Sequence, residues 1–410
     1  MNNQKLLDRI LDLAGNYCKS STINKVIGLK NEREQYLNNI WNKENYKSLI
    51  PERNMKNSTR RIDFDTIIYF VKKEIIKQKF KKFLLEIVEI SFDSGELEYS
   101  KETINSIISV EMEYLTKEEL SALYYKLGEI YFYQNEFDLS KNHFKNSLSL
   151  CEASEDLHGV AKAKNSLGVL MIEQGLYKEG KALFDAARNI ASEQGFANLV
   201  IKCDISLGNY FYMQGDTKSA LEKYFTVKEY AETKKIPDLL AKALLNIASS
   251  YRYNSDFENS MNFVDKASKI LEKSSNKFSK ALFYLVKGET LIFQNELQTG
   301  LAILTCAFTL FSEIGDRLSI ADTYRAMGIL YSKKGDENIA LSYLETSVKL
   351  NRSVNNYLNL GETYLALAEH FKQKSDYTKA LIYYKNAKEC FIIIPGSKKV
   401  EQIDTLITTI

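Results

Sequence analysis

Residues that interrupt helices are scarce in this sequence. Only 3 of its 410 residues are proline and 18 are glycine, whereas average usage is about 5% and about 7%. Proline lacks a backbone N–H and clashes with the preceding turn, and glycine weakens a helix interior. This composition excludes a collagen-like chain, argues against an all-β fold and favours long helices.

Cysteine and histidine are also few. The 5 cysteines are odd in number and no two lie within a CxxC window, which excludes a zinc ribbon or a disulfide framework. We expect buried thiols in a reducing compartment, and hence a cytoplasmic protein. The 3 histidines, His143, His158 and His370, do not pair at metal-ligand spacing. We interpret each as a surface or structural residue and predict no metal.

A charge excess of one sign is absent. The 55 basic and 53 acidic residues leave a net charge of +2, which excludes a nucleic-acid binder with a basic surface throughout. The N-terminal stretch from Met1 to Gly15 carries charges every few positions and does not resemble a secretory signal. The longest apolar stretch, Ala302 to Phe311, is too short to cross a bilayer. We therefore expect a soluble chain without a membrane span.

A repeat at a fixed spacing is the main feature that is present. Seven pairs, each usually a bulky residue followed by a small one, recur every 40 positions without insertion or deletion. They are Leu127-Gly128, Leu167-Gly168, Leu207-Gly208, Ile247-Ala248, Lys287-Gly288, Met327-Gly328 and Leu367-Ala368. A second small residue follows 12 positions later, and a bulky residue 4 positions after that. Small residues let two helices approach closely, and bulky ones fill the groove beside them.

Polar turns separate the two halves of each unit, as at Gly215-Asp216 and Gly335-Asp336. Such residues end one helix and cap the next, so each unit is predicted to be a helical hairpin that needs its neighbours to bury its apolar face. An eighth, divergent copy lies one period upstream of the first pair. It places Gly95 at the turn, Ser100 at the second small position and Val88 where a glycine is expected.

The order of Leu-Gly, a bulky residue, a small residue and Phe or Tyr resembles the tetratricopeptide repeat. The 40-residue unit is similar to the long-helix variety of kinesin light chains, LGN-type adaptors and bacterial peptide-sensing regulators. The resemblance covers about residues 81 to 394. It implies an all-α, right-handed superhelical solenoid of about eight antiparallel hairpins. The usual tryptophan is replaced by tyrosine, for example at Tyr124 and Tyr284, and the proline that often ends the repeat is absent.

The ends of the chain do not follow the period. We predict a non-repeat helical extension over residues 1–76, the solenoid over 77–394, and a capping helix over 395–410 after a break at Pro395-Gly396. In the extension, helical patterns at Gln4 to Tyr17 and Asn24 to Asn42 precede an irregular polar stretch from Asn45 to Thr59. A long helix is predicted to start near Asp63 and to run into the first repeat.

No pattern of catalytic residues is found. The sequence has no phosphate-binding glycine loop, no HExxH and no GxSxG. We therefore predict a protein that is not an enzyme and has no cofactor. The lysines between Lys72 and Lys82 and the net charge of +5 in residues 1–76 leave nucleic-acid binding open only for residues 1–82. A solvated helix face is the favoured interpretation of these lysines.

The resemblance implies that the first helix of each hairpin lines a concave groove, at positions 2, 5, 6, 9, 12 and 13 counted from Ser121. The groove residues it assigns are polar, charged or aromatic: Tyr125, Glu129, Tyr133, Asn165, Asn209, Tyr212, Asn246, Arg252, Tyr253, Glu289, Phe293 and Arg325. An asparagine amide can pair with a peptide unit in two hydrogen bonds. Asn165, Asn209 and Asn246 are predicted either to bind a peptide backbone or to bridge adjacent hairpins.

The leading hypothesis is a non-catalytic adaptor that holds a peptide segment of a partner protein in this groove. The alternative is a peptide-sensing signalling or transcriptional regulator in which residues 1–76 form the output module, contacting DNA or a response protein. Lys202, Lys242 and Arg325 depart in spacing from the lysine-asparagine clamp of chaperone-tail binders, so we do not expect that ligand. The partner, the pathway and the oligomeric state stay open.

Overall fold

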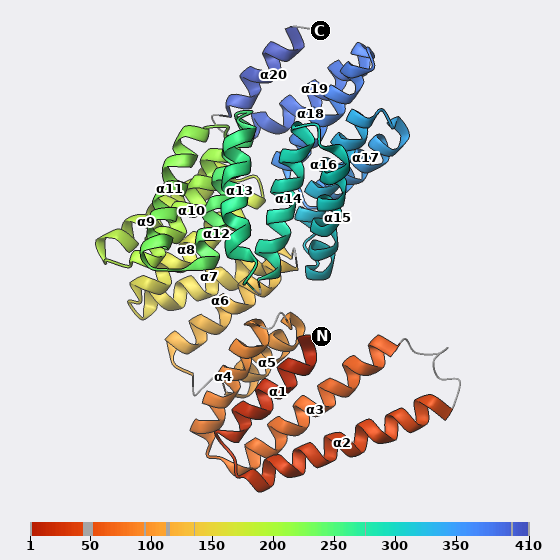
Figure 1. Cartoon of the computed structure of the whole chain (residues 1–410). Helices are drawn as coiled ribbons and strands as arrows, with labels where there is room; N and C mark the ends of the chain where they lie inside the picture. The colour runs from red at the N-terminus through yellow and green to blue at the C-terminus, as the bar shows by residue number, and fades with distance from the viewer. Residues whose placement is uncertain are drawn as a thin grey trace. The chain divides into compact units, whose positions relative to one another are not determined.

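A computed structural model describes residues 2–43, 52–93, 96–111, 115–134, 136–274, 276–394 and 397–408. All regular elements in these ranges are helices, as the sequence predicts. The chain divides into two compact units, Met1–Ile130 and Tyr131–Ile410, which are described separately (Figure 1). The boundary lies within helix α6. The separate role predicted for residues 1–76 stays a prediction.

The first unit contains α1 to α5 and most of α6. Their bounds are α1 Asn2–Gly15, α2 Ser20–Lys43, α3 Glu52–Glu74, α4 Lys77–Asp93, α5 Leu97–Glu111 and α6 Lys117–Tyr133. The helix α3 begins well before Asp63 and ends before α4, so the prediction of one long helix running into the first repeat was wrong. Two residues, Ile75 and Ile76, separate the helices. The break at Pro395-Gly396 and part of the stretch after Asn45 lie outside the described residues.

The predicted eighth hairpin is formed by α4 and α5. Ser100, Ile104 and Ile107 are fully buried, and Val88 is 1% exposed. The Ser100 hydroxyl donates to the Val88 carbonyl at 3.4 Å. A divergent copy with valine in place of glycine therefore still packs as a hairpin, although Gly95 lies outside the described ranges.

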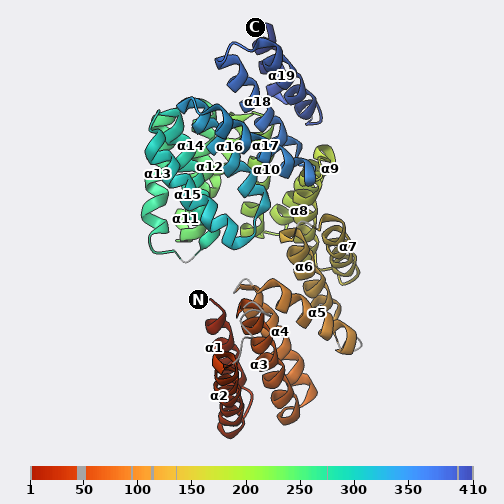
Figure 2. The ribbon, with the colours of Figure 1, turned by 90° about the vertical axis from the view of Figure 1, so that its right-hand side faces the viewer.

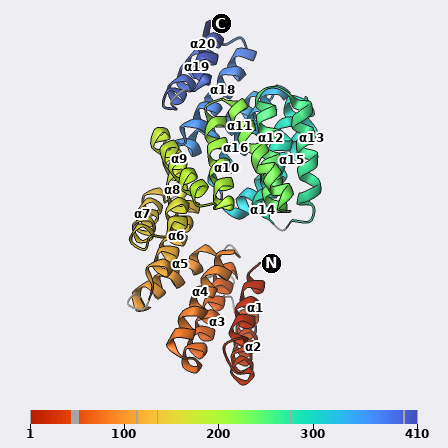
Figure 3. The same ribbon diagram turned by 90° about the vertical axis from the view of Figure 1, so that its left-hand side faces the viewer.

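The second unit is a series of helical hairpins (Figures 2 and 3). It holds most of the solenoid predicted over residues 77–394, whose first hairpin, α4–α5, and most of α6 belong to the first unit. Its helices are α7 Phe137–Ala153, α8 Leu157–Glu173, α9 Tyr177–Glu193, α10 Ala197–Met213, α11 Thr217–Thr233, α12 Pro237–Tyr253, α13 Phe257–Leu271, α14 Lys277–Phe293, α15 Leu297–Ile314, α16 Arg317–Lys334, α17 Glu337–Ser353, α18 Tyr357–Gln373, α19 Tyr377–Ile392 and α20 Lys398–Thr408. Each even-numbered helix from α8 to α18 packs against the helix that follows it.

Close packing within each hairpin depends on the small residue of the repeat. A Cβ atom added to Gly208 would lie 2.6 Å from the ring of Tyr224, and one added to Gly328 would lie 2.6 Å from Leu344. In both cases the bulky partner occupies the later packing position that the pattern predicts. These contacts explain why a small residue is required at positions 208 and 328, where the facing side chain is already in close contact.

The turns have a period that is half as long as the repeat. A residue with positive φ occurs at every twentieth position from Glu155 to Ser375, apart from position 275, which is not described. At the first of these turns, Asp156 N–H donates to the Cys151 carbonyl at 2.9 Å. This hydrogen bond is typical of a left-handed helix cap. Six of the left-handed residues are not glycine, which explains why the sequence pattern did not reveal this period.

The solenoid of the second unit curves until distant hairpins meet. One hydrophobic cluster contains Phe184 and Leu207 together with Tyr364, Phe391 and Ile403. The ring of Tyr357 lies 3.2 Å from the position that a Cβ atom would take on Gly175. The helices α8 to α10 therefore share a core with α18 to α20.

The helix α15 is long and apolar enough to cross a membrane by length and composition. In the structure it forms the second helix of the α14–α15 hairpin. Leu304, Ala307 and Phe311 are fully buried in a cluster with residues of α14 and α16. The apolar composition of α15 therefore serves, at least in part, the packing of the solenoid.

Candidate functional site

The first helices of three consecutive hairpins are joined by a buried charge network. Arg252 Nη2 of α12 lies 2.8 Å from Glu289 Oε2 of α14, and Arg325 Nη2 of α16 lies 3.3 Å from Glu289 Oε1. Glu289 is only 6% exposed. The structure thus brings together three of the predicted groove residues, which lie about one repeat apart in the sequence.

The network continues to Asp322 and α18. Arg325 Nη2 lies 3.6 Å from Asp322 Oδ1, and Asn359 Nδ2 donates to Asp322 Oδ2 at 3.1 Å. Burial raises the pKa of Asp322 to about 6, although the nearby Arg325 lowers it. The prediction missed Asp322, yet this residue stands at position 2 of its repeat, one of the expected groove positions.

The asparagines form a second polar group. Asn246 Nδ2 donates to Asn209 Oδ1 at 3.4 Å, and Tyr224 Oη donates to the same oxygen at 2.8 Å. Asn209 and Asn246 therefore bridge adjacent hairpins in this structure, which is one of the two predicted roles. Asn165 differs, because its buried Oδ1 has no hydrogen-bond partner among the described residues.

Aromatic side chains lie beside these polar groups. Tyr212 and Tyr253 meet edge to face, with ring centroids 5.8 Å apart. Burial raises the pKa of Tyr253 to about 12. Phe293 stacks on Phe257 at 5.4 Å and remains 41% exposed. The second unit therefore combines charged, amide and aromatic groups on α10, α12 and α14.

Two predicted residues belong to the first unit. Tyr125 is 9% exposed and contributes to its core, and Glu129 is half-buried. Tyr133 is in the second unit and is 58% exposed. The remaining nine predicted residues all lie in the second unit, so the candidate site is confined to that unit.

Two further ionisable side chains were not among the predicted groove residues. Burial raises the pKa of Glu173, near the end of α8, to about 7, and the neighbouring Asp316 and Asp322 raise it further. The pKa of Lys242 on α12 is lowered by burial and then by Lys202 on α10. Lys242 is nevertheless accessible to solvent. Lys242 is therefore open to solvent and yet has many protein atoms around it, as is expected of a side chain inside a concave surface.

The histidines have packing roles. His143 stacks on Tyr131 with ring centroids 5.2 Å apart, and His158 meets Phe196 edge-on at 5.1 Å. His370 is 1% exposed, and its Nδ1 lies 2.7 Å from the Ser332 hydroxyl. These contacts agree with the structural interpretation made from the sequence.

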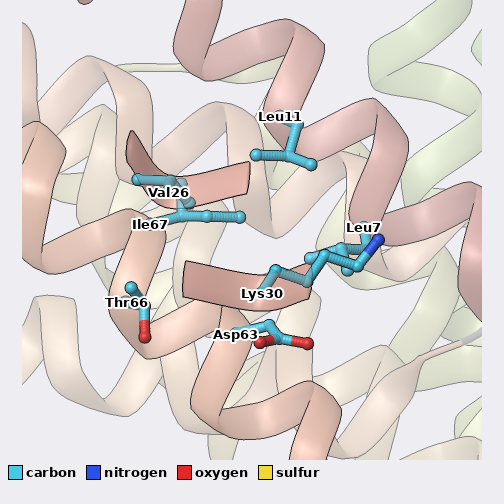
Figure 4. Close-up of a pocket in the computed structure, with 7 residues that line it drawn as sticks. All are labelled: Leu7, Leu11, Val26, Lys30, Asp63, Thr66 and Ile67. Carbon is cyan, nitrogen blue, oxygen red and sulfur yellow. The ribbon is translucent and has the colours of Figure 1, made fainter. Parts of the chain in front are cut away.

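The first unit has a small pocket between α1, α2 and α3 (Figure 4). Leu7, Leu11, Val26, Lys30, Asp63, Thr66 and Ile67 line it. Asp63 pairs with Arg33, and burial raises the pKa of Asp63. The lining is mostly aliphatic and its carboxylate is already paired, so we interpret the pocket as a packing feature.

The lysines of α3 and α4 have local partners. Lys73 lies over the ring of Tyr69 at 4.5 Å, and Lys81 Nζ donates to Glu119 Oε2 at 2.8 Å. Lys82 lies 3.9 Å from Glu86. These contacts favour a solvated helix face over a dedicated phosphate-binding strip.

Comparison with known proteins supports the repeat assignment. Family models described as tetratricopeptide repeat match residues 319–392 and 121–154. The chain carries tetratricopeptide repeats. No curated protein sequence matches it.

Several solved structures share the fold of this tetratricopeptide-repeat chain. A Rap protein complexed with competence and sporulation factor is 15% identical, with a TM-score of 0.63, over 94% of this chain and 99% of that one. Aspartyl phosphate phosphatase F from Bacillus subtilis is 16% identical, with a TM-score of 0.52, over 95% of each chain. NprR in complex with its cognate peptide NprX is 14% identical, with a TM-score of 0.53, over 82% of this chain and 99% of that one. At 14–16% sequence identity, these similarities show a shared fold and nothing more specific.

Proposed function

We propose that this chain is a non-catalytic adaptor that binds a peptide segment of a partner protein on the concave side of its second unit. Buried polar atoms left without a partner carry the proposal. Among the described residues, Asn165 Oδ1, Arg252 Nε and Arg325 Nε are buried and make no hydrogen bond. An unsatisfied buried polar group costs about 1–3 kcal/mol, so a peptide backbone that paired with these atoms would be bound favourably.

The comparisons support this choice of ligand. The Rap protein and NprR are described as complexes with a factor and with a cognate peptide, respectively. Both have the fold of this chain. Tyr212, Tyr253 and Phe293 supply aromatic surface beside the polar atoms, and such side chains bind at a low cost in conformational entropy. The five free thiols are consistent with a cytoplasmic location.

Peptide capture by the asparagines can be tested on the full-length chain. Short peptides would be selected from a random synthetic library on the immobilised protein, and their affinities measured by calorimetry. Changing Asn165, Asn209 and Asn246 together to alanine is expected to weaken binding at least tenfold, which corresponds to about 1.4 kcal/mol. Equal affinities for the variant and the unmodified protein would remove the asparagines from the site.

A matched control is available on the second helices of the hairpins. Asn262, Asn338 and Asn386 lie on α13, α17 and α19. Changing these three to alanine removes the same number of amides and is expected to leave affinity within twofold. Circular dichroism of both triple variants separates loss of binding from loss of helices.

A second candidate function is a signalling regulator with residues 1–76 as the output module. The observation that favours it is coverage, because the Rap and phosphatase structures align over 94% and 95% of this chain, beyond its repeats. The module would contact a response protein or DNA. A mobility shift of a DNA duplex with the full-length chain, in low and high salt, distinguishes these partners. Binding that weakens steeply with salt indicates DNA, and no shift leaves the response protein.

A further inference from the structure

The C-terminal helix α20 is attached to residues far back in the chain. Lys398 N–H donates to the Gln214 carbonyl at 2.9 Å, and Lys398 Nζ donates to Asp216 Oδ1 at 3.1 Å, across 182 positions of sequence. Tyr253 Oη donates to Gln402 Oε1 at 3.3 Å. The helix therefore links α19 to the ends of α10 and α12, all within the second unit.

The two attachments of α20 differ in strength. Ile403 is 1% exposed and shares a core with Tyr384 and Phe391 of α19. On the other side the bonds are polar, and the Lys398 and Asp216 side chains are 57% and 28% exposed. Exposed ion pairs contribute little to stability. Ile403 shares this core with Leu207 and Tyr210 of α10 as well, so the exposed polar bonds of Lys398 and Tyr253 are the contacts with α10 and α12 that we expect to open first.

Through Lys399, the helix α20 contacts residues of the candidate site. Lys399 is 4% exposed, and among the residues whose side-chain burial the structure describes, no other lysine or arginine is buried to this extent. Its ammonium contacts Glu362 of α18 and lies 5.1 Å from the ring of Tyr253 and 4.9 Å from that of Phe391. Burial lowers the pKa of Lys399 to about 7, and the nearby Arg325 and Arg252 lower it further. Of the predicted groove residues, Tyr253 therefore contacts α20 directly, while Arg252 and Arg325 act on Lys399 only through charge repulsion.

We propose that α20 is an intramolecular clasp over this end of the concave surface. It must detach from α10 and α12 before a peptide can bind beside Tyr253. The inference rests on the proposed peptide-binding function and adds its regulation. If only a fraction of the molecules is in the conformation that binds the peptide, the apparent association constant equals the intrinsic one multiplied by that fraction. Loosening the polar contacts is thus expected to strengthen peptide binding, and locking them is expected to weaken it at least tenfold.

A disulfide can lock the clasp. The position of a Cβ atom on Gly215 is 3.7 Å from Lys398 Cβ, close to the mean Cβ separation of about 3.8 Å in disulfides. Gly215 has a φ of +77°, and Ser255 adopts +60° at the equivalent turn, so this backbone conformation is open to a residue other than glycine. Cβ at Gly215 would approach Tyr253 Oη at 2.9 Å. The single variant Gly215→Cys therefore serves as the control for local strain.

The test compares oxidised and reduced Gly215→Cys/Lys398→Cys full-length chain. The probe is a peptide selected from the random library on the unmodified protein. Oxidation is expected to weaken binding at least tenfold, reductant to restore it, and Gly215→Cys alone to show no response to either. Equal binding by the oxidised and reduced chains overturns the clasp while leaving the peptide-binding function intact.

A ligand-free measurement keeps the two proposals apart. In the reduced chain, amide hydrogens of α20 are expected to exchange at least tenfold faster than those of α19, and the disulfide is expected to remove the difference. Lys398→Gln should accelerate exchange in α20. Lys388→Gln, which breaks the 2.5 Å pair with Asp404 on the α19 side, should do so less. If α20 exchanges as slowly as α19, the clasp is overturned, whether or not a library peptide binds. If no library peptide binds, the proposed function is contradicted, whatever the exchange of α20.

Discussion

The repeat hairpins and the N-terminal helices use the same residue types under different constraints. The helices from α7 to α12 each have 17 residues, and short turns of equal length separate them. The helices α1, α2 and α3 have 14, 24 and 23 residues and share no period. In the hairpins each packing position recurs every 40 residues, so the sequence repeat identifies the residues that pack. In the N-terminal helices each contact occurs once, and only the spacing of apolar residues indicates it.

The largest expected effect is a loss of core volume. Phe184 of α9 is 2% exposed and Phe83 of α4 is fully buried. Changing either to alanine is expected to cost about 3–5 kcal/mol in the free energy of unfolding. Because a repeat contacts mainly its neighbours, hydrogen exchange in α1 should be unaffected by Phe184→Ala. Faster exchange in α1 would show that the units unfold together.

A glycine-to-alanine substitution is expected to change the free energy of unfolding in opposite directions in the two regions. Gly328→Ala in α16 places a Cβ 2.6 Å from Leu344, and such overpacking costs about 1–3 kcal/mol. Gly28→Ala in α2 meets nothing within 4 Å, so it is expected to stabilise the chain by about 0.5–1 kcal/mol through helix propensity. Urea unfolding measures both effects. Two changes of the same sign would contradict the packing role of the repeat glycine.

The third prediction concerns pH. Burial, together with Asp316 and Asp322, raises the pKa of Glu173 to about 7 in the folded chain, from 4.5. The folded state therefore holds the proton more tightly, and stability falls as the pH rises from about 4.5 to 7. Glu173→Gln, which removes this titration, is expected to raise stability by up to about 3 kcal/mol at pH 8.

The same variant should behave like the unmodified chain at the lower end of that pH range, where the folded state keeps the carboxyl group protonated and the penalty has not yet developed. Thermal unfolding of the two chains at both ends of the range checks the difference. Glu179→Gln on the exposed side of α9 is the control and should show little change at either pH. A Glu173→Gln effect that is equal at both values would exclude the titration as its cause.

The smallest effect is expected at the turns. Lys235 has a φ of +54°, a conformation that glycine adopts without steric cost. Lys235→Gly is expected to stabilise the chain by about 0.5–1 kcal/mol. Lys234→Gly is the control, because Lys234 is in the right-handed region with a φ of −86° and gains nothing. Chemical unfolding of both variants measures the contrast, and equal effects would contradict the assignment of Lys235 to a left-handed cap.

Much of the fold could be predicted, and less of the site. Glycine and its bulky partner recur at fixed positions of the repeat, so their contact in the hairpin follows from the pattern. Asn209 and Asn246 were correctly assigned to neighbouring hairpins, but their mutual hydrogen bond was only one of two possibilities. Asp322 and Glu173 stand at positions 2 and 13 of their repeats, which are expected groove positions, but nothing in the sequence separates them from the other polar residues at these positions. Their pKa values are raised first by burial and then by acidic neighbours, some of them on other hairpins, and both causes depend on the folded array.

The sequence alone determined the helical hairpins, their number and their stacking, because local periodicity selects helices and small residues select close contacts. The tertiary structure decided which groups meet across the curve of the solenoid. Lys399 lies outside the repeat, and no spacing in the sequence indicates that it contacts Glu362 and Tyr253. Curvature accumulates from small rotations between hairpins, so contacts between distant repeats depend on the whole array.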